Sequence, residues 1–181
     1  VFTFLENDRN RYLIGLSLIL ISLFLTFSFS SYFFSWKADQ DKVEYWSTTG
    51  YEIFNENYDH ANDAKNNMGT IGAKVSDFFI NKSFGIFAFC IPVFIFFLGV
   101  KLAFKKQLLP IKSTFWKIIP LMIWGPTLLG LLFKSSSFNF GGALGTQINT
   151  WLHYLAGTWG TIFILLFFGF IISRFSFNIR I

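Results

Sequence analysis

Hydrophobic and polar residues are separated along this chain into long blocks. A bilayer core about 30 Å thick is crossed by a helix of roughly 17–25 mostly apolar residues. Four apolar runs approach this length, and we predict a transmembrane helix from each, at residues 12–34, 84–104, 115–133 and 158–175. The predicted fold is therefore an all-α integral membrane domain that occupies residues 1–181 as a single unit.

The first apolar run ends abruptly. In the stretch SYFFSWKADQDKVE, the residues before Trp36 are mostly apolar, and charged or amide side chains follow from Lys37 onwards. Because Tyr and Trp rings favour the headgroup level, we place Tyr32 and Trp36 at the outer membrane surface. Lys37 and its successors are then expected in water, at the start of an irregular or partly helical outer loop that covers residues 37–67.

Two later segments share one pattern of residues. GTIGAKVSDFF (residues 69–79) and GALGTQINTWL (residues 142–152) each repeat a glycine after three positions and then place apolar residues on one helical face. The glycines that mark this pattern are Gly69, Gly72, Gly142 and Gly145. We predict short amphipathic helices at the outer interface, at about residues 68–81 and 142–156. The chain then turns inward at Gly85, and at Gly157 or Gly160.

This repetition predicts two hairpins of one plan, each made of a span, an interfacial helix and a second span. A chance recurrence of glycine and aliphatic residues, which are common in membrane proteins, stays open as the alternative to a true duplication.

Composition and charge agree with a membrane domain. Hydrophobic residues make up 53% of the chain and charged residues 14%, against about a quarter charged in soluble domains. Nine basic and two acidic residues flank the ends predicted to lie inside, whereas residues 37–82 carry five lysines and eight acidic residues. By the positive-inside rule, both termini and the connection between the second and third spans are cytoplasmic.

Five lysines border the second and third spans and alternate with Leu, Phe and Trp. They are Lys101, Lys105, Lys106, Lys112 and Lys117. Such a cluster attracts anionic lipid headgroups, with about 1 kcal/mol per lysine near the surface. Binding of DNA is the alternative function for the same lysines.

Three stretches of the chain carry a family resemblance: YFFSWKADQDKV, MGTIGAKVSDFFINKSFGIFAFCIPVFIFFLGVKL and FNFGGALGTQINTWLHYLAGTWGTIFILLFF. They resemble the N-terminal four-helix membrane region of FtsK/SpoIIIE-type DNA translocases, in the form found in Bacteroidetes-like bacteria. The resemblance extends over nearly all of the chain. One departure is the third span, which Pro120 and Gly125–Pro126 interrupt.

The resemblance implies a multi-pass anchor in the bacterial inner membrane, at the division septum, that acts in cell division and chromosome segregation. It implies a cytoplasmic motor domain, absent from this chain, that binds ATP, magnesium and DNA. The partners implied for the anchor are the lipid bilayer, other division membrane proteins and further copies of itself, as a hexamer through the full-length protein.

The residues themselves show little chemistry. The nearest approach to a P-loop, GPTLLGLLFKS, has its lysine, Lys134, three positions too late. The apolar cores of the spans contain no Asp, Glu, Lys, Arg or His, which argues against a proton-coupled transporter or an ion pump. We therefore predict a non-enzymatic chain with no catalytic, cofactor-binding or metal-binding residues. A small transporter or channel subunit, or an accessory subunit of an envelope complex, is the alternative.

A stripe of small polar residues in the first span is the candidate for assembly. Ser22, Thr26 and Ser30 recur every four residues and therefore share one helical face. Small residues let helices approach closely, and their hydroxyls form interhelical hydrogen bonds. Whether this face packs within one subunit or between subunits stays open at this point.

Overall fold

The computed structural model describes residues 7–48, 64–106 and 108–177, and all regular structure in them is helical. Four helical stretches are long and apolar enough to cross a membrane, which confirms the predicted four-span all-α fold. The elements are α2 (Asp8–Thr48), α3 (Gly69–Ser76), η2 (Asp77–Phe84), η3 (Gly85–Phe89), α4 (Cys90–Phe104), α5 (Ile111–Leu132) and α6 (Gly142–Phe177).

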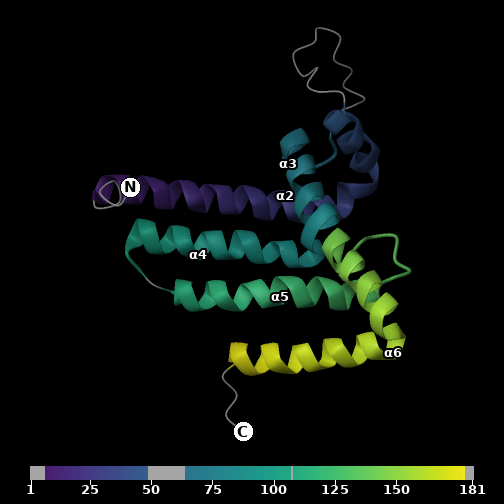
Figure 1. Ribbon diagram of the computed structural model, residues 1–181. Helices are drawn as coiled ribbons and strands as arrows, with labels where there is room; N and C mark the ends of the chain where they lie inside the picture. The colour runs from purple at the N-terminus through teal and green to yellow at the C-terminus, as the bar shows by residue number, and fades with distance from the viewer. Residues whose placement is uncertain (1–6, 49–63, 107, 178–181) are drawn as a thin grey trace.

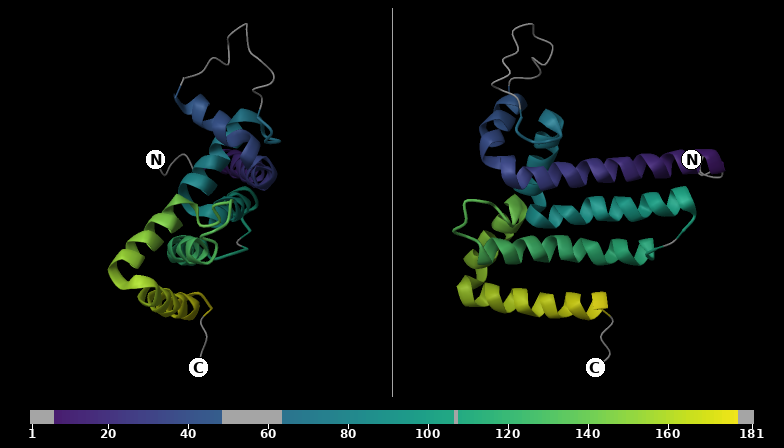
Figure 2. Two further views of the ribbon diagram at one scale, coloured as in Figure 1. Left: turned by 90° about the vertical axis from the view of Figure 1, so that its right-hand side faces the viewer. Right: turned by 180° about the vertical axis from the view of Figure 1, so that it is seen from behind.

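The spans form an open row. Figure 1 shows α2, α4, α5 and the C-terminal part of α6 side by side, and the left view of Figure 2 shows that the row does not close into a bundle. Helix α2 packs mainly against α4, and α5 packs mainly against α6, whereas α4 and α5 contact each other much less. The domain is therefore two helical hairpins placed next to each other.

Four glycines with a positive φ divide these hairpins into segments. Gly69 and Gly142, with φ of 65° and 63°, begin the helices that precede the second and fourth spans. Gly85 and Gly157, with φ of 60° and 65°, stand where these helices give way to the spans. Since a left-handed backbone favours glycine, each turn falls where the sequence supplies one. The chain therefore turns at corresponding glycines in the two hairpins.

Gly157 splits α6 into two helical segments. Its φ of 65° and ψ of −176° are not helical, so residues 142–156 and 158–177 run in different directions. In the first hairpin, α3 and η2 together take the place of the expected interfacial helix, and η2 contains π-type turns. That helical segment extends to Phe84, three residues beyond the predicted boundary at residue 81.

The helix that forms the first span continues beyond the predicted end of that span at residue 34. Helix α2 continues to Thr48, so the first part of the predicted outer loop is helical, and the end of the helix turns away from its first part (Figure 1). Residues 37–48 contain no glycine or proline that would stop a helix. Asp39, which was expected in water, is fully buried. Residues 49–63 of the predicted loop lie outside the described part of the chain.

The largest fully buried apolar side chains lie in the first hairpin, near the end that is remote from the N-terminus. Phe29, Ile80 and Ala88, from α2, η2 and η3, have no exposed surface. Aromatic rings surround them: the Phe33 ring stacks on that of Phe89 at 5.9 Å between centroids, and the Phe138 ring lies 5.1 Å from that of Phe33. By contrast, most of the span surface is exposed, as expected for helices whose solvent is lipid.

The third span is one continuous helix despite its two prolines. Pro120 and Pro126 both lie inside α5, so the prolines do not create a discontinuous helix of the kind that forms transport sites. A Cβ atom at Gly125 would overlap the ring of Phe87, and one at Gly145 would overlap the backbone of Pro126. The Gly125–Pro126 step is therefore a packing site between α5 and its neighbours.

Candidate functional site

A network of buried polar side chains joins the C-terminal half of α2 to the chain that precedes and forms α3. Ser28 donates a hydrogen bond from its Oγ to the carbonyl oxygen of Gly72, at 2.8 Å. Its Oγ also lies 2.6 Å from that of Ser76, and both serines are fully buried. Because the Ser28 proton is used on Gly72, the Ser76 hydroxyl is the donor in the second bond. The absence of a side chain at Gly72 permits this close approach.

Asp39 holds the chain that leads into α3. Its two carboxylate oxygens accept hydrogen bonds from the backbone N–H groups of Lys65, at 2.6 Å, and Asn66, at 3.0 Å. Asn66 in turn donates from Nδ2 to the carbonyl oxygen of Ser28, at 3.0 Å, and accepts from the N–H of Met68, at 2.9 Å. A buried carboxylate is stable only when such donors replace water. Asp39 therefore acts as the anchor of residues 65–68.

A second buried carboxylate, Asp77, links α2 to η2. Its Oδ1 accepts hydrogen bonds from the Tyr32 hydroxyl and from Nδ2 of Asn81, both at 3.0 Å. Its Oδ2 lies 3.2 Å from the ammonium of Lys82. Only 3% of Asp77 is exposed, so its charge is compensated almost wholly by these three groups.

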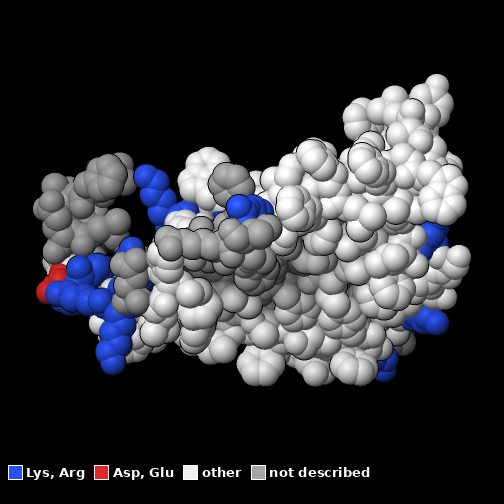
Figure 3. Space-filling model, turned by 90° about the horizontal axis from the view of Figure 1, so that it is seen from below, with Lys and Arg blue, Asp and Glu red and all other residues white. Residues whose placement is uncertain are grey.

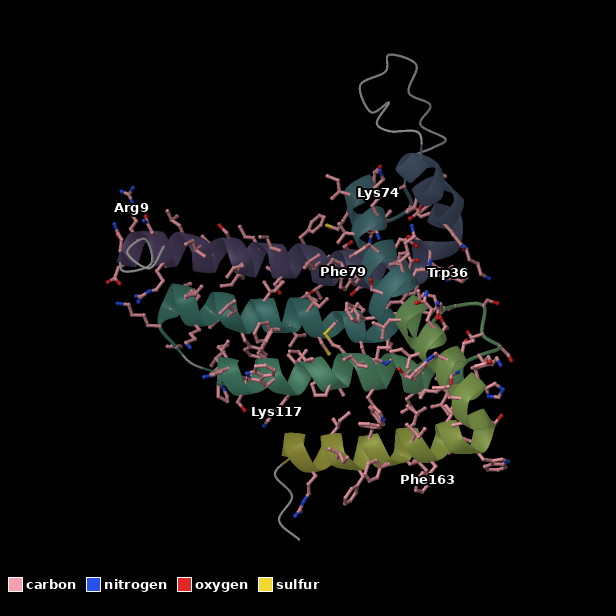
Figure 4. All side chains as sticks on the ribbon, in the orientation of Figure 1. Arg9, Trp36, Lys74, Phe79, Lys117 and Phe163 are labelled. Atoms are coloured by element: carbon pink, nitrogen blue, oxygen red, sulfur yellow. The ribbon has the colours of Figure 1, made fainter. Side chains whose placement is uncertain are left out.

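These contacts connect helices and do not form a reactive centre. Each carboxylate is saturated by hydrogen-bond donors from neighbouring segments. Within the described ranges, no group of three or more His, Cys, Asp or Glu side chains could hold a metal ion. Figure 4 shows Trp36 and Phe79 at the same junction, so aromatic side chains lie around the polar contacts.

The predicted serine stripe is divided by the structure. Ser22 is 2% exposed and donates a hydrogen bond to the carbonyl oxygen of Pro92 on α4, at 2.8 Å. Thr26 is half-buried and bonds to the carbonyl oxygen of Ser22 in its own helix. Ser30 is exposed. One end of the stripe therefore packs inside the subunit, and the other end faces outward.

The candidate glycines differ in role. Gly69 begins α3 in open space, whereas Gly72 lies against Asn66 and Ser28. Gly142 lies against the backbone of Gly85, and Gly145 lies against that of Pro126. Three of the four glycines are therefore sites of close backbone or side-chain approach, and the second pair joins α6 to the rest of the domain.

The candidate lysines gather with Arg9 and Arg11 at the end opposite to the polar network. Figure 3 shows this end as a cluster of blue side chains, separated by a broad uncharged surface from the few at the other end. Of the five, Lys101 is half-buried and the other four are exposed, and Lys105 makes an ion pair with Asp8 at 3.1 Å. Figure 4 places Arg9 and Lys117 at this end.

Sequence reasoning missed the residues of the polar network. Ser28, Ser31 and Ser35 recur at three- and four-residue spacing in α2, and all three are buried. This spacing is a second small-residue face of the same helix, next to the stripe that was predicted. This spacing indicates that another element packs closely on this face of α2, although it does not identify α3 as that element.

Comparison with family models matches residues 7–181 to the 4TM region of DNA translocase FtsK/SpoIIIE. No curated protein and no solved structure matches the chain.

Proposed function

The chain belongs to the family of 4TM regions of DNA translocase FtsK/SpoIIIE, and from this membership we propose that it anchors such a translocase in the bacterial inner membrane at the division septum. The observation that carries the proposal is the match over residues 7–181, which includes all four spans. The anchored motor would act in cell division and chromosome segregation.

The geometry supports a structural role as a membrane anchor rather than a catalytic role. The two buried carboxylates, Asp39 and Asp77, are saturated by donors from neighbouring segments, which fixes the outer end of the first hairpin. The opposite end carries the lysine and arginine cluster, which suits a cytoplasmic membrane surface rich in anionic lipid. We propose that residues 1–181 hydrolyse no nucleotide and bind no cofactor.

We propose different partners for the domain in the membrane, at its outer side and in the cytoplasm. The lipid bilayer surrounds the four spans, and other division membrane proteins meet the domain within the membrane or at its outer side. Copies associate as a hexamer through the full-length protein. ATP, magnesium and DNA are bound by a cytoplasmic motor domain and not by this domain.

Exchange of the domain tests the anchor function. In the full-length gene, residues 7–181 are replaced by an unrelated four-span domain with cytoplasmic termini, and a fluorescent protein is fused to the C-terminus. We expect the chimera to insert in the membrane but to lose its enrichment at the septum, while the unchanged protein keeps it. Septal enrichment of the chimera would contradict the proposal and assign the targeting to the rest of the protein.

A further inference from the structure

A cavity of about 220 Å³ lies between the loop that joins α5 to α6 and the first turns of α6. This volume is far above the roughly 10–15 Å³ that a cavity needs to hold one water molecule. The loop follows the apolar end of α5 directly and begins with Lys134 and three serines, so the cavity stands where the hydrocarbon core gives way to headgroups. The cavity therefore lies at the depth of the lipid headgroups in the bilayer.

The polar lining of the cavity comes from Ser136, Ser137 and Asn139 of the loop and from one face of α6, and the α6 face presents hydrogen-bond acceptors. Asn149 is 7% exposed, and its Oδ1 has no hydrogen-bond partner. Thr146 and Thr150 use their hydroxyl protons on backbone carbonyls, at 3.0 and 2.8 Å, which leaves lone pairs on their oxygens. All three residues line the cavity. A ligand that satisfies this wall must bring donors.

The rest of the lining includes three aromatic rings and one lysine, which suit an ammonium and an anion respectively. The rings of Phe133, Phe138 and Phe140 line the cavity, and the last two lie 4.9 Å apart between centroids. Aromatic faces attract ammonium groups. Lys134 lies on the same lining and is exposed, so its ammonium is available to a phosphate.

We propose that this cavity binds the phosphoethanolamine headgroup of a membrane phospholipid. The primary ammonium donates to Asn149 and to the threonine oxygens between the aromatic rings, and the phosphate lies beside Lys134. The acyl chains extend along the apolar surface of α5 and α6. The site is independent of the proposed anchor function, since it depends only on the lining of the cavity.

Lipid competition on the purified chain in detergent tests the site without any mutation. The probes are dioleoyl phosphatidylethanolamine, its N-methyl and N,N-dimethyl derivatives, phosphatidylcholine and phosphatidylglycerol, with native mass spectrometry as the readout. We expect affinity to fall with each N–H donor that is lost. Phosphatidylcholine and phosphatidylglycerol should bind at least about tenfold more weakly than phosphatidylethanolamine, because a hydrogen bond to a charged group is lost.

Variants then test which residues contact the ammonium and which contact the phosphate of the headgroup. Asn149→Leu should reduce the discrimination between methylated and unmethylated lipids, because one of three acceptors is lost, whereas Lys134→Gln should weaken every phospholipid and leave that discrimination intact. Gln147→Leu is the matched control, because this exposed residue of the same helix lies outside the cavity. If Asn149→Leu fails to fold, Thr150→Val, at an exposed position, replaces it as the test of the acceptor wall.

Three results would overturn the proposal. The first is equal binding of phosphatidylethanolamine and phosphatidylcholine. The second is undiminished discrimination along the methylation series by a folded Asn149→Leu protein. The third is competition by a lysine amide, or by free phosphoethanolamine, as strong as that by the intact lipid, since these would assign the cavity to a partner protein or to a soluble ligand.

Discussion

Gly69 and Gly85 both have a positive φ but differ in their surroundings. Replacing each by alanine therefore distinguishes the cost of backbone strain from the cost of a steric clash. Gly69 has open space around the position of a Cβ atom, so Gly69→Ala meets only the cost of a left-handed backbone, about 1–2 kcal/mol. At Gly85 a Cβ atom would also overlap the carbonyl oxygen of Phe140. We expect Gly85→Ala to lower the free energy of unfolding by clearly more than Gly69→Ala, as measured by denaturant titration in mixed micelles. Equal losses would mean that the Phe140 backbone yields without cost.

Asp39 gives a second prediction about a single side chain. Asp39→Ala leaves the N–H groups of Lys65 and Asn66 without acceptors, and we expect a loss of about 2–4 kcal/mol in the free energy of unfolding. Asp39→Asn keeps one acceptor oxygen and should cost less. Gln40→Ala, at an exposed neighbour, is the control and should change little. An Asp39→Ala protein as stable as the control would show that water replaces the carboxylate.

Helix α2 has a face that packs on α4, at Ser22, and an exposed face, at Ser30. One substitution on each face distinguishes their contributions to stability. Ser22→Leu introduces bulk into the contact with α4 and leaves the Pro92 carbonyl oxygen without its donor. We expect a loss of about 1–3 kcal/mol in unfolding free energy. Ser30→Leu should alter it by less than about 0.5 kcal/mol, since this residue is exposed.

Crosslinking in native membranes completes this comparison. If Ser30 faces another copy of the chain, Ser30→Leu will reduce the crosslinked oligomers without affecting the unfolding of the monomer. Unchanged oligomers in the Ser30→Leu protein would place self-association elsewhere in the full-length protein.

The elements that the sequence predicts well are those encoded locally. Spans follow from apolar length, and the turns at Gly85 and Gly157 follow from glycines in a repeated pattern. The continuation of α2 to Thr48 was missed because its charged residues are equally compatible with a loop in water. Asp39 is buried only because Lys65 and Asn66 return to it from 26 and 27 residues further along the chain.

The polar network was not predicted as a site because its contacts join residues that are far apart in the sequence. Ser22 and Ser28 are the same residue type on one helix, and their partners, Pro92 and Gly72, come from two different elements. Which face of α2 meets α3 and which meets α4 depends on the rotation of the helix in the assembled hairpin. Small residues indicate that close packing occurs, but they do not identify the partner.

For the whole molecule, the separation of charge predicts the direction of insertion. In a Cys90→Ser background, a cysteine at Ser136 should react with a membrane-impermeant thiol reagent in intact cells, and one at Leu108 should react only after the cells are opened. Both positions are exposed, so access depends on the side of the membrane rather than on burial. Labelling at Leu108 from outside would reverse the orientation that the positive-inside rule predicts.

The open row also determines how the domain bears a mechanical load. In a closed bundle every helix is held by at least two others, whereas α6 ends the row and packs as a span mainly against α5. A pulling force applied at the C-terminal end of α6 is therefore carried first by one helix pair. It reaches α2 through the small α4–α5 contact and through the packing of α6 and α5 on η2 and η3. Under tension such an array yields one neighbour at a time, as repeat proteins do, so the pair α5–α6 sets the force at which the domain begins to come apart.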